Sequence, residues 1–207
     1  MSTAYIPVQG THAWDEDPHN FQWWEPDSAF SQYVSTLGLV PVNVKLPFVW
    51  STSLDGVFTK QHAWKGAAYA LRYYLGEQFP YGLPPQKRNL IAHSHGGQCV
   101  FYACALGLTI RNLITIGTPV RRDMETIVAA ARPNIGYWLH ICDSRNDFMS
   151  VAGALFDGAI RIRHDFALAD RNDNCKDLRI SHSKVLTDPN RYGLWQTRDW
   201  AAALHRA

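Results

Sequence analysis

The feature that most constrains the fold is residues 89–100, where an apolar run stops at Ser94 and a helical pattern led by glycine begins at once. This order predicts a buried strand, a very tight turn and a helix. In such a turn the serine takes a strained backbone conformation that lifts its hydroxyl clear of the sheet edge. Ala92 and Gly96 flank Ser94, and both are small enough to let the helix pass close to the strand.

The pentapeptide at 93–97, His-Ser-His-Gly-Gly, resembles the nucleophile elbow of the α/β-hydrolase superfamily, in the form common among its esterases and lipases. One position differs, because Ala92 stands where the G-x-S-x-G pattern of the family has glycine. Other segments also resemble lipase-like members, namely 24–38, 48–51 and 114–119. The alternative interpretation of the pentapeptide is a glycine turn that only joins a buried strand to a helix.

The composition excludes several classes of protein. With 207 residues, of which 46% are hydrophobic and 18% charged, the chain is expected to form one soluble globular domain over 1–207. A net charge of +2 without any basic run argues against nucleic acid as a partner. The first residues have no signal-peptide pattern, and no stretch approaches the roughly 20 apolar residues of a membrane span, so a cytoplasmic location is expected.

The cysteines show neither the spacing of a metal site nor the density of a disulfide framework. Cys99, Cys104 and Cys142 lie in apolar segments and are predicted to be small core residues. We therefore expect neither a metal nor a cofactor.

Strand and helix patterns alternate along the chain. Strands are predicted at 5–8, 39–46, 89–93, 110–116, 135–142 and 159–162. Helices are predicted at 27–37, 64–75, 95–106, 124–131, 151–156 and from 181 onward. The alternation predicts an α/β fold, with a mostly parallel sheet of about six strands, helices on both faces and ligands at the carboxyl ends of the strands. The resemblance implies an α/β-hydrolase core that lacks a cap domain and the first two antiparallel strands, for which the N-terminal residues leave no room.

A catalytic serine needs two partners. Its hydroxyl is a weak nucleophile at neutral pH, so a histidine must accept its proton and a carboxylate must fix the tautomer of that histidine. The resemblance implies the chain order serine, acid, histidine. His182, at the head of the closing helical segment, is the candidate base for Ser94. His164 directly follows the predicted last strand and His205 lies at the end of the chain, so both fit this position less well.

The candidate acids are Asp143 and Asp147, which both follow the penultimate strand. In the family the acid often precedes a short apolar helix start, and residues 147–151 resemble that segment more closely. Asp147 is therefore preferred, with Asp143 kept as the alternative. A helix N-cap is a second role for Asp147, and it is compatible with the first.

The oxyanion of the tetrahedral intermediate needs N–H donors. The backbone N–H of His95, directly after the serine, is the first candidate. The resemblance places the second in the loop after the first strand, where residues 9–11 stand at the H-G-x position of the family. Thr11 N–H is the candidate there and His12 the alternative, because Gln9 replaces the usual histidine. Aromatic residues near the same edge either line an acyl or aromatic pocket or pack in the core: Trp14, Trp23, Trp24, Trp50 and Phe148.

Together these features predict a serine hydrolase that cleaves carboxylic esters, with lipid or short-chain esters as substrates. A metal-dependent hydrolase that uses His93 and His95 is the second hypothesis. Against it, Gly97 and Gln98 stand where an H-x-H-x-D-H motif has its aspartate and histidine. A non-catalytic binding module on the same scaffold is the third hypothesis. The oligomeric state does not follow from the sequence.

Overall fold

The computed structural model describes residues 2–10, 22–42, 60–76, 83–147 and 164–206. These residues contain a six-stranded sheet in the order β2-β1-β3-β4-β5-β6, and every neighbouring pair of strands is parallel. The strands are β1 (Thr3–Val8), β2 (Leu39–Pro41), β3 (Asn89–His93), β4 (Ile110–Ile116), β5 (Ile135–Cys142) and β6 (Arg171–Asn174). The α/β fold with a parallel sheet is thus confirmed.

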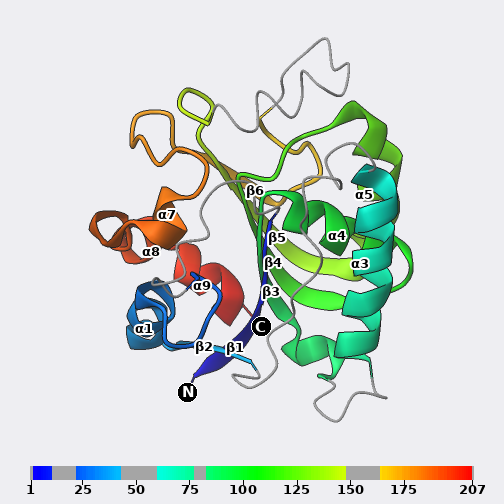
Figure 1. The fold of residues 1–207 in the computed structure, drawn as a ribbon, viewed down its shortest axis with the longest axis horizontal. Helices are drawn as coiled ribbons and strands as arrows, with labels where there is room; N and C mark the ends of the chain where they lie inside the picture. Colours follow the sequence, from blue (N-terminus) through cyan, green and yellow to red (C-terminus); the bar gives the residue numbers. More distant parts are fainter. Residues whose placement is uncertain (1, 11–21, 43–59, 77–82, 148–163, 207) are drawn as a thin grey trace.

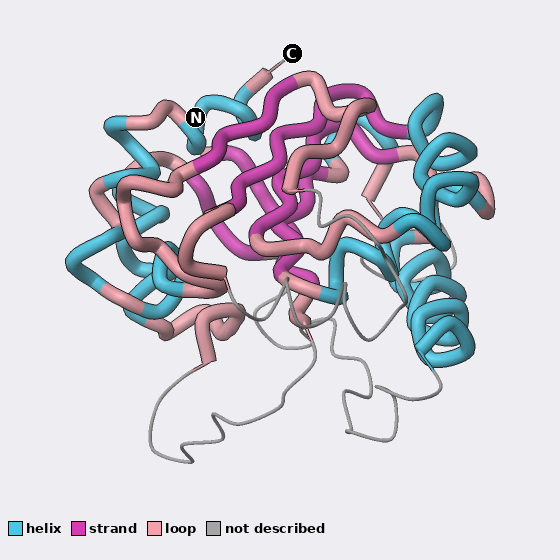
Figure 2. The backbone as a smooth tube through the Cα atoms, turned by 90° about the horizontal axis from the view of Figure 1, so that it is seen from above, coloured by secondary structure: helices cyan, strands magenta, loops and turns pink. Residues whose placement is uncertain are grey.

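Helices cover both faces of the sheet, as Figures 1 and 2 show. One face carries α3 (Lys60–Leu75), α4 (His95–Ala105) and α5 (Glu125–Ala131). The other carries α1 (Ala29–Thr36), α7 (Lys184–Thr187), α8 (Leu194–Thr197) and α9 (Trp200–His205). Single 3-10 turns are η1 (Pro85–Lys87), η2 (Arg122–Met124), η3 (Arg132–Asn134) and η4 (Pro189–Arg191). None of the helices described has the length and apolar character needed to cross a membrane.

The core is divided by the sheet into two hydrophobic clusters. Side chains alternate along each strand, so Leu113 packs with α3, α4 and α5, whereas its neighbour Ile114 packs with α1 and the C-terminal helices. Both faces are buried, which explains why the central strands are apolar along most of their length. Cys99, Cys104 and Cys142 are buried free thiols, as expected, and Cys175 is buried as well.

Local signals set most element boundaries. Ser28 caps α1, because its Oγ accepts the N–H of Ser31 at 3.0 Å, and the helix predicted from residue 27 therefore begins at Ala29. The chain leaves this helix at Gly38, whose φ of 79° suits glycine. Pro41 lies in the outermost strand on its side of the described sheet, in agreement with its inability to donate a backbone hydrogen bond.

The sequence interpretation is wrong for β6. Residues 171–174 lie between the strand predicted at 159–162 and the helix predicted from 181, where no strand is predicted, but they pair with β5 from Leu139↔Arg171 to Cys142↔Asn174. This strand has no apolar pattern because polar contacts hold it in place: Asp173 accepts hydrogen bonds from Arg171, Arg198 and the Trp200 indole. The strand expected at 159–162 and the helix expected at 151–156 lie outside the described residues.

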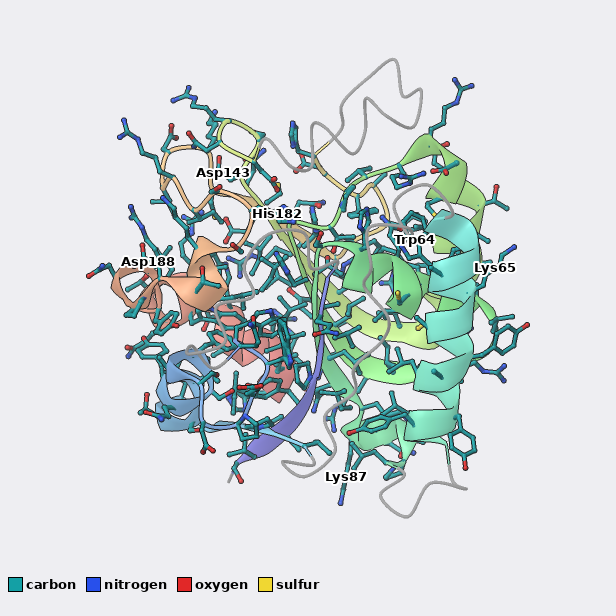
Figure 3. All side chains as sticks on the ribbon, viewed as in Figure 1. Trp64, Lys65, Lys87, Asp143, His182 and Asp188 are labelled. Carbon is teal, nitrogen blue, oxygen red and sulfur yellow. The ribbon has the colours of Figure 1, made fainter. Side chains whose placement is uncertain are left out.

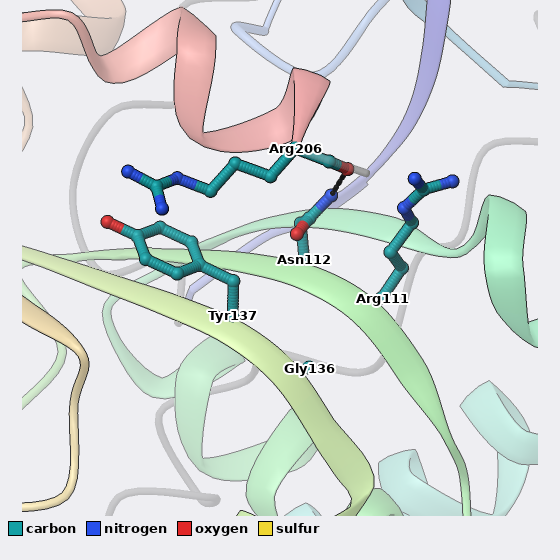
Figure 4. Close-up of a pocket in the computed structure, with 5 residues that line it drawn as sticks. All are labelled: Arg111, Asn112, Gly136, Tyr137 and Arg206. Carbon is teal, nitrogen blue, oxygen red and sulfur yellow. Dashed lines mark hydrogen bonds between the residues drawn. The ribbon is translucent and has the colours of Figure 1, made fainter.

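A cavity of about 430 Å³ opens at the amino-terminal edge of the sheet (Figure 4). The Arg206 guanidinium lies 4.0 Å from the ring centroid of Tyr137, and Asn112 Nδ2 donates to the Arg206 carbonyl at 3.2 Å. These three residues line the cavity together with Arg111 and Gly136, which lie near the starts of β4 and β5. This cavity therefore lies at the end of the sheet away from Ser94, which follows β3.

Candidate active site

Ser94 occupies a strained turn between β3 and α4. Its backbone angles, φ of 52° and ψ of −130°, lie in a region that residues other than glycine rarely adopt. A hydrogen bond to the neighbouring strand stabilises this conformation, because Ser94 N–H donates to the carbonyl of Ile116 at 2.9 Å. The strand, turn and helix expected at 89–100 are therefore present, with a positive φ at the serine.

Glycines allow the chain to pack tightly around this turn. A Cβ on Gly96 would lie 2.4 Å from the Gln9 carbonyl oxygen and 2.5 Å from that of Val8, so only glycine lets α4 approach the end of β1. A Cβ on Gly10 would lie 2.5 Å from the Cβ of Ser94. The end of β1 thus sits directly against the serine.

His182 contacts a carboxylate through one ring nitrogen. Its Nδ1 lies 2.9 Å from Oδ1 and 3.1 Å from Oδ2 of Asp147, whose side chain is 1% exposed. An ionised carboxylate only accepts hydrogen bonds, so we assign the proton to Nδ1, and the neutral ring keeps its lone pair on Nε2. A histidine in this tautomer can accept a proton at Nε2.

Asp143 has a different set of partners. Its Oδ1 accepts the backbone N–H groups of Arg145 and Asn146, and its Oδ2 accepts the N–H of Ser181 at 3.0 Å. Asp143 and His182 lie at the same end of the sheet, opposite Lys87, which precedes β3 (Figure 3). Of the two aspartates, Asp147 is the one whose carboxylate contacts the His182 ring, while Asp143 joins its own loop to the loop before His182.

His182 and Ser94 both contact the carboxyl end of β4. Gly117 follows Ile116, the residue that binds Ser94 N–H, and it has a φ of 55°. A Cβ on Gly117 would lie 2.8 Å from the His182 carbonyl oxygen and 2.9 Å from its Nδ1. The histidine thus lies against the end of β4, beside the turn that holds the serine.

His93 is part of this cluster, although sequence reasoning considered it only as a metal ligand. Its Nε2 lies 3.2 Å from the carbonyl oxygen of His182, and the two rings lie 4.8 Å apart. The ring of Trp23 also meets that of His93 edge-on, with the two ring centroids 6.3 Å apart. Burial, and secondly the charge of His182, lower the pKa of His93 to about 3, so its ring is neutral at pH 7.

His95, the other half of the H-x-H pair, points elsewhere. Its ring lies 5.1 Å from that of Trp64, in the cluster on the opposite face from Trp23. The two imidazoles therefore give no support to a shared metal. Within the part of the chain that the structure describes, no group of three His, Cys, Asp or Glu side chains could hold a metal ion. The backbone N–H of His95 lies in the first turn of α4, where N–H groups lack intrahelical partners.

The remaining candidates are distributed as follows. His205 binds Thr3 Oγ1 at 2.8 Å, at the amino-terminal end of β1, and the carbonyl of His164 accepts from His140 Nε2 at 3.0 Å. Trp23 and Trp24 are buried and contact each other edge-to-face. The other candidates lie outside the described residues: Thr11, His12, Trp14, Trp50 and Phe148.

Comparisons with known proteins find structural similarity only. No family model and no curated protein matches the chain. S-formylglutathione hydrolase (FrmB) from Staphylococcus aureus is similar over 97% of this chain and 81% of its own, with a TM-score of 0.47 and 10% identity. Esterase B from Lactobacillus rhamnosis, with a tributyrin phosphonate inhibitor, is similar over 99% of this chain and 76% of its own, with a TM-score of 0.46 and 10% identity. Similarity at this level assigns no roles to individual residues of this chain.

Proposed function

We propose that the protein is a serine hydrolase that cleaves carboxylic esters by acyl transfer. The observation that carries the proposal is the contact of His182 Nδ1 with both oxygens of buried Asp147, at 2.9 and 3.1 Å. It supports the proposal because His182 lies against Gly117, the residue after Ile116, whose carbonyl accepts the N–H of Ser94 in its strained turn. A nucleophile, a base and a carboxylate that orients the base are the parts that serine acyl transfer requires.

In this mechanism His182 moves one proton in each half of the reaction. Ser94 Oγ attacks the ester carbonyl carbon while His182 Nε2 accepts the hydroxyl proton. The tetrahedral intermediate collapses, the bond to the alcohol oxygen breaks, and His182 gives its proton to the leaving alcohol. Water then attacks the acyl-enzyme, His182 accepts a proton from the water, and the proton returns to Ser94 Oγ as the carboxylic acid leaves.

The acid and the oxyanion donors stabilise the charges that develop. Asp147 holds the Nδ1–H tautomer of His182 and stabilises the imidazolium formed during each attack. We assign the oxyanion to the backbone N–H groups of His95 and Thr11. Removal of one such donor typically lowers kcat by about 10²- to 10³-fold.

For the substrate we propose lipid or short-chain esters. Trp23 is 5% exposed and borders His93, which in turn contacts His182. Trp23 also packs edge-on against Trp24 and Phe30 in the core. The choice of an ester with an apolar acyl group therefore rests on the resemblance of residues 93–97 to the elbow of esterases and lipases.

The direct test is Ser94→Ala. We expect kcat for p-nitrophenyl esters of graded chain length to fall by at least about 10⁴-fold, with little change in melting temperature, because alanine lacks the nucleophile but fits the same turn. A fluorophosphonate probe should label the wild type and not the variant.

Retained turnover in Ser94→Ala would refute the proposal. Loss of wild-type activity on dialysis against EDTA would favour the metal-dependent hydrolase. A folded wild type that neither turns over esters nor reacts with the probe would favour a binding module.

A further inference from the structure

His93 forms a direct link between the nucleophile turn and the candidate base. It is the last residue of β3 and therefore the covalent neighbour of Ser94. Its Nε2 lies 3.2 Å from the backbone oxygen of His182. A carbonyl oxygen only accepts, so Nε2 of His93 carries the proton and donates it. The two imidazoles also contact each other, with centroids 4.8 Å apart and planes at 60°.

We infer that His93 is a positioning residue, whose Nε2–H holds the His182 carbonyl and thereby fixes the imidazole of His182 relative to the hydroxyl of Ser94. This inference rests on the proposed function. It assigns to His93 no contact with the substrate. A misplacement of about 1 Å in a catalytic group can lower the rate about 10²-fold, so such a link affects turnover directly.

The loop before His182 needs tethers of this kind. Arg179 and Ser181 both have positive φ values, 50° and 53°, so the chain here follows no regular element. One tether comes from the β5 side, where Asp143 Oδ2 accepts the N–H of Ser181 at 3.0 Å. His93, at the end of β3, supplies a second tether, because its Nε2 contacts the carbonyl of His182, the residue after Ser181. The loop is therefore held both from the acid side and from the serine side.

A neutral donor suits this position. Burial, and secondly the nearby charge of His182, lower the pKa of His93 to about 3. Other charges that act on His93 are those of Asp147 and, weakly, His95. When His182 becomes an imidazolium, a neutral neighbour does not repel it, whereas a second cation 4.8 Å away would raise the free energy of the transition state.

Two substitutions separate the hydrogen bond from the volume of the ring. His93→Met keeps a similar size without a donor, and His93→Gln places an amide N–H near the former Nε2. We expect Met to lower kcat and the rate of fluorophosphonate labelling by about 10- to 100-fold at similar KM. Gln should recover most of that loss. Equal rates in the Met and Gln variants, whether both high or both low, would overturn the inference.

Two controls keep the outcomes distinct. Full activity in Ser94→Ala would reject the proposed function itself, whereas loss in Ser94→Ala with wild-type rates in His93→Met would reject only the role of His93. Should the Met variant fail to fold, ¹⁵N chemical shifts of the histidines in the wild type decide. We expect a neutral His93 ring with its proton on Nε2, and a proton on Nδ1 would overturn the inference.

Discussion

At the scale of residues, two aspartates of one loop have separate tasks. Asp147 donates its own N–H to the carbonyl of Asp143 at 3.0 Å and directs its carboxylate at His182. Asp143 uses its carboxylate on backbone N–H groups, including that of Ser181. Both follow β5, and the sequence favours Asp147 only through its resemblance at residues 147–151, with Asp143 as the alternative. In the structure the two differ in their partners, because the carboxylate of Asp147 contacts the His182 ring and that of Asp143 contacts the backbone.

Asparagine substitutions should separate these tasks. In Asp147→Asn the amide can donate to Nδ1 and favour the wrong tautomer of His182, so we expect kcat to fall by about 10³- to 10⁴-fold with an almost unchanged urea midpoint. In Asp143→Asn an NH₂ group meets backbone donors, and the free energy of unfolding should fall by about 1–3 kcal/mol. Ester kinetics and urea titrations of both variants measure this. Equal effects on kcat would contradict the division.

His140 predicts how stability depends on pH. It is fully buried, its Nδ1 accepts from Thr115 Oγ1 at 2.8 Å, and its Nε2 donates to the carbonyl of His164 at 3.0 Å. Burial lowers its pKa from 6.5 to about 4. Between these values the unfolded chain binds a proton that the folded protein does not, so stability falls as the pH falls.

The size of this effect can be measured by substitution. Between about pH 6 and pH 4.5 the free energy of unfolding should fall by up to about 1.4 kcal/mol per pH unit from His140 alone. His140→Gln should remove that part of the slope in urea titrations. His93 and the carboxylates continue to contribute in the variant, and an unchanged slope would show that His140 is not the source.

At the scale of elements, one glycine sets how closely α4 approaches β1. A Cβ on Gly96 would lie 2.4 Å from a backbone oxygen, which cannot move without the strand. Gly66 in α3 is a matched control, because a Cβ there would have no atom within 4 Å.

Alanine should therefore have opposite effects at the two sites. Gly96→Ala is expected to lower the free energy of unfolding by about 2 kcal/mol or more, since a strand or helix must shift. Gly66→Ala should raise it by about 0.5–1 kcal/mol, because alanine restricts the unfolded chain and favours the helix. Urea denaturation measures both values, and a stable Gly96→Ala protein would show that the contact relaxes.

The elements that sequence patterns predicted are those whose stability comes from their own apolar residues. β3, β4 and β5 each contain several buried apolar residues, and α4 begins directly after Ser94. Chain order also gave Ser94, Asp147 and His182 as candidates; the structure brings His182 to Asp147, and the catalytic roles of the three stay a proposal. β6 escaped prediction because its partners lie far along the chain: the indole that binds Asp173 is 27 residues away. His93 escaped for a related reason, since its acceptor is a backbone carbonyl, which has no sequence signature.

At the scale of the whole molecule, Asp173 ties the outer strand to the C-terminal helices. Its side chain is 7% exposed and binds the Trp200 indole at 2.7 Å together with Arg171 and Arg198. The last of these helices returns to β1, where His205 binds Thr3. Loss of this carboxylate should therefore weaken the sheet and the C-terminal helices together.

Asp173→Ala tests this tie. It leaves a buried indole N–H without an acceptor and two arginines without their counter-charge, so we expect a loss of at least about 2 kcal/mol in unfolding free energy. The control is Asp177→Ala, which removes a pair with Arg145 whose side chains are 71% and 68% exposed and should cost at most about 1 kcal/mol. Similar melting temperatures for the two variants would contradict the role of Asp173.

The parallel pairing of every described strand also affects the order in which the candidate active site assembles during folding. Parallel neighbours cannot be joined by a hairpin, so each pair forms only after an intervening crossover has been made. Ser94, Asp147 and His182 follow this rule, because each is reached through a separate crossover. During synthesis Ser94 leaves the ribosome before His182, the base proposed for it, so a nascent chain that ends between these two residues carries a serine without its partner. Under the proposed mechanism, esterase activity would appear only in chains that extend past His182.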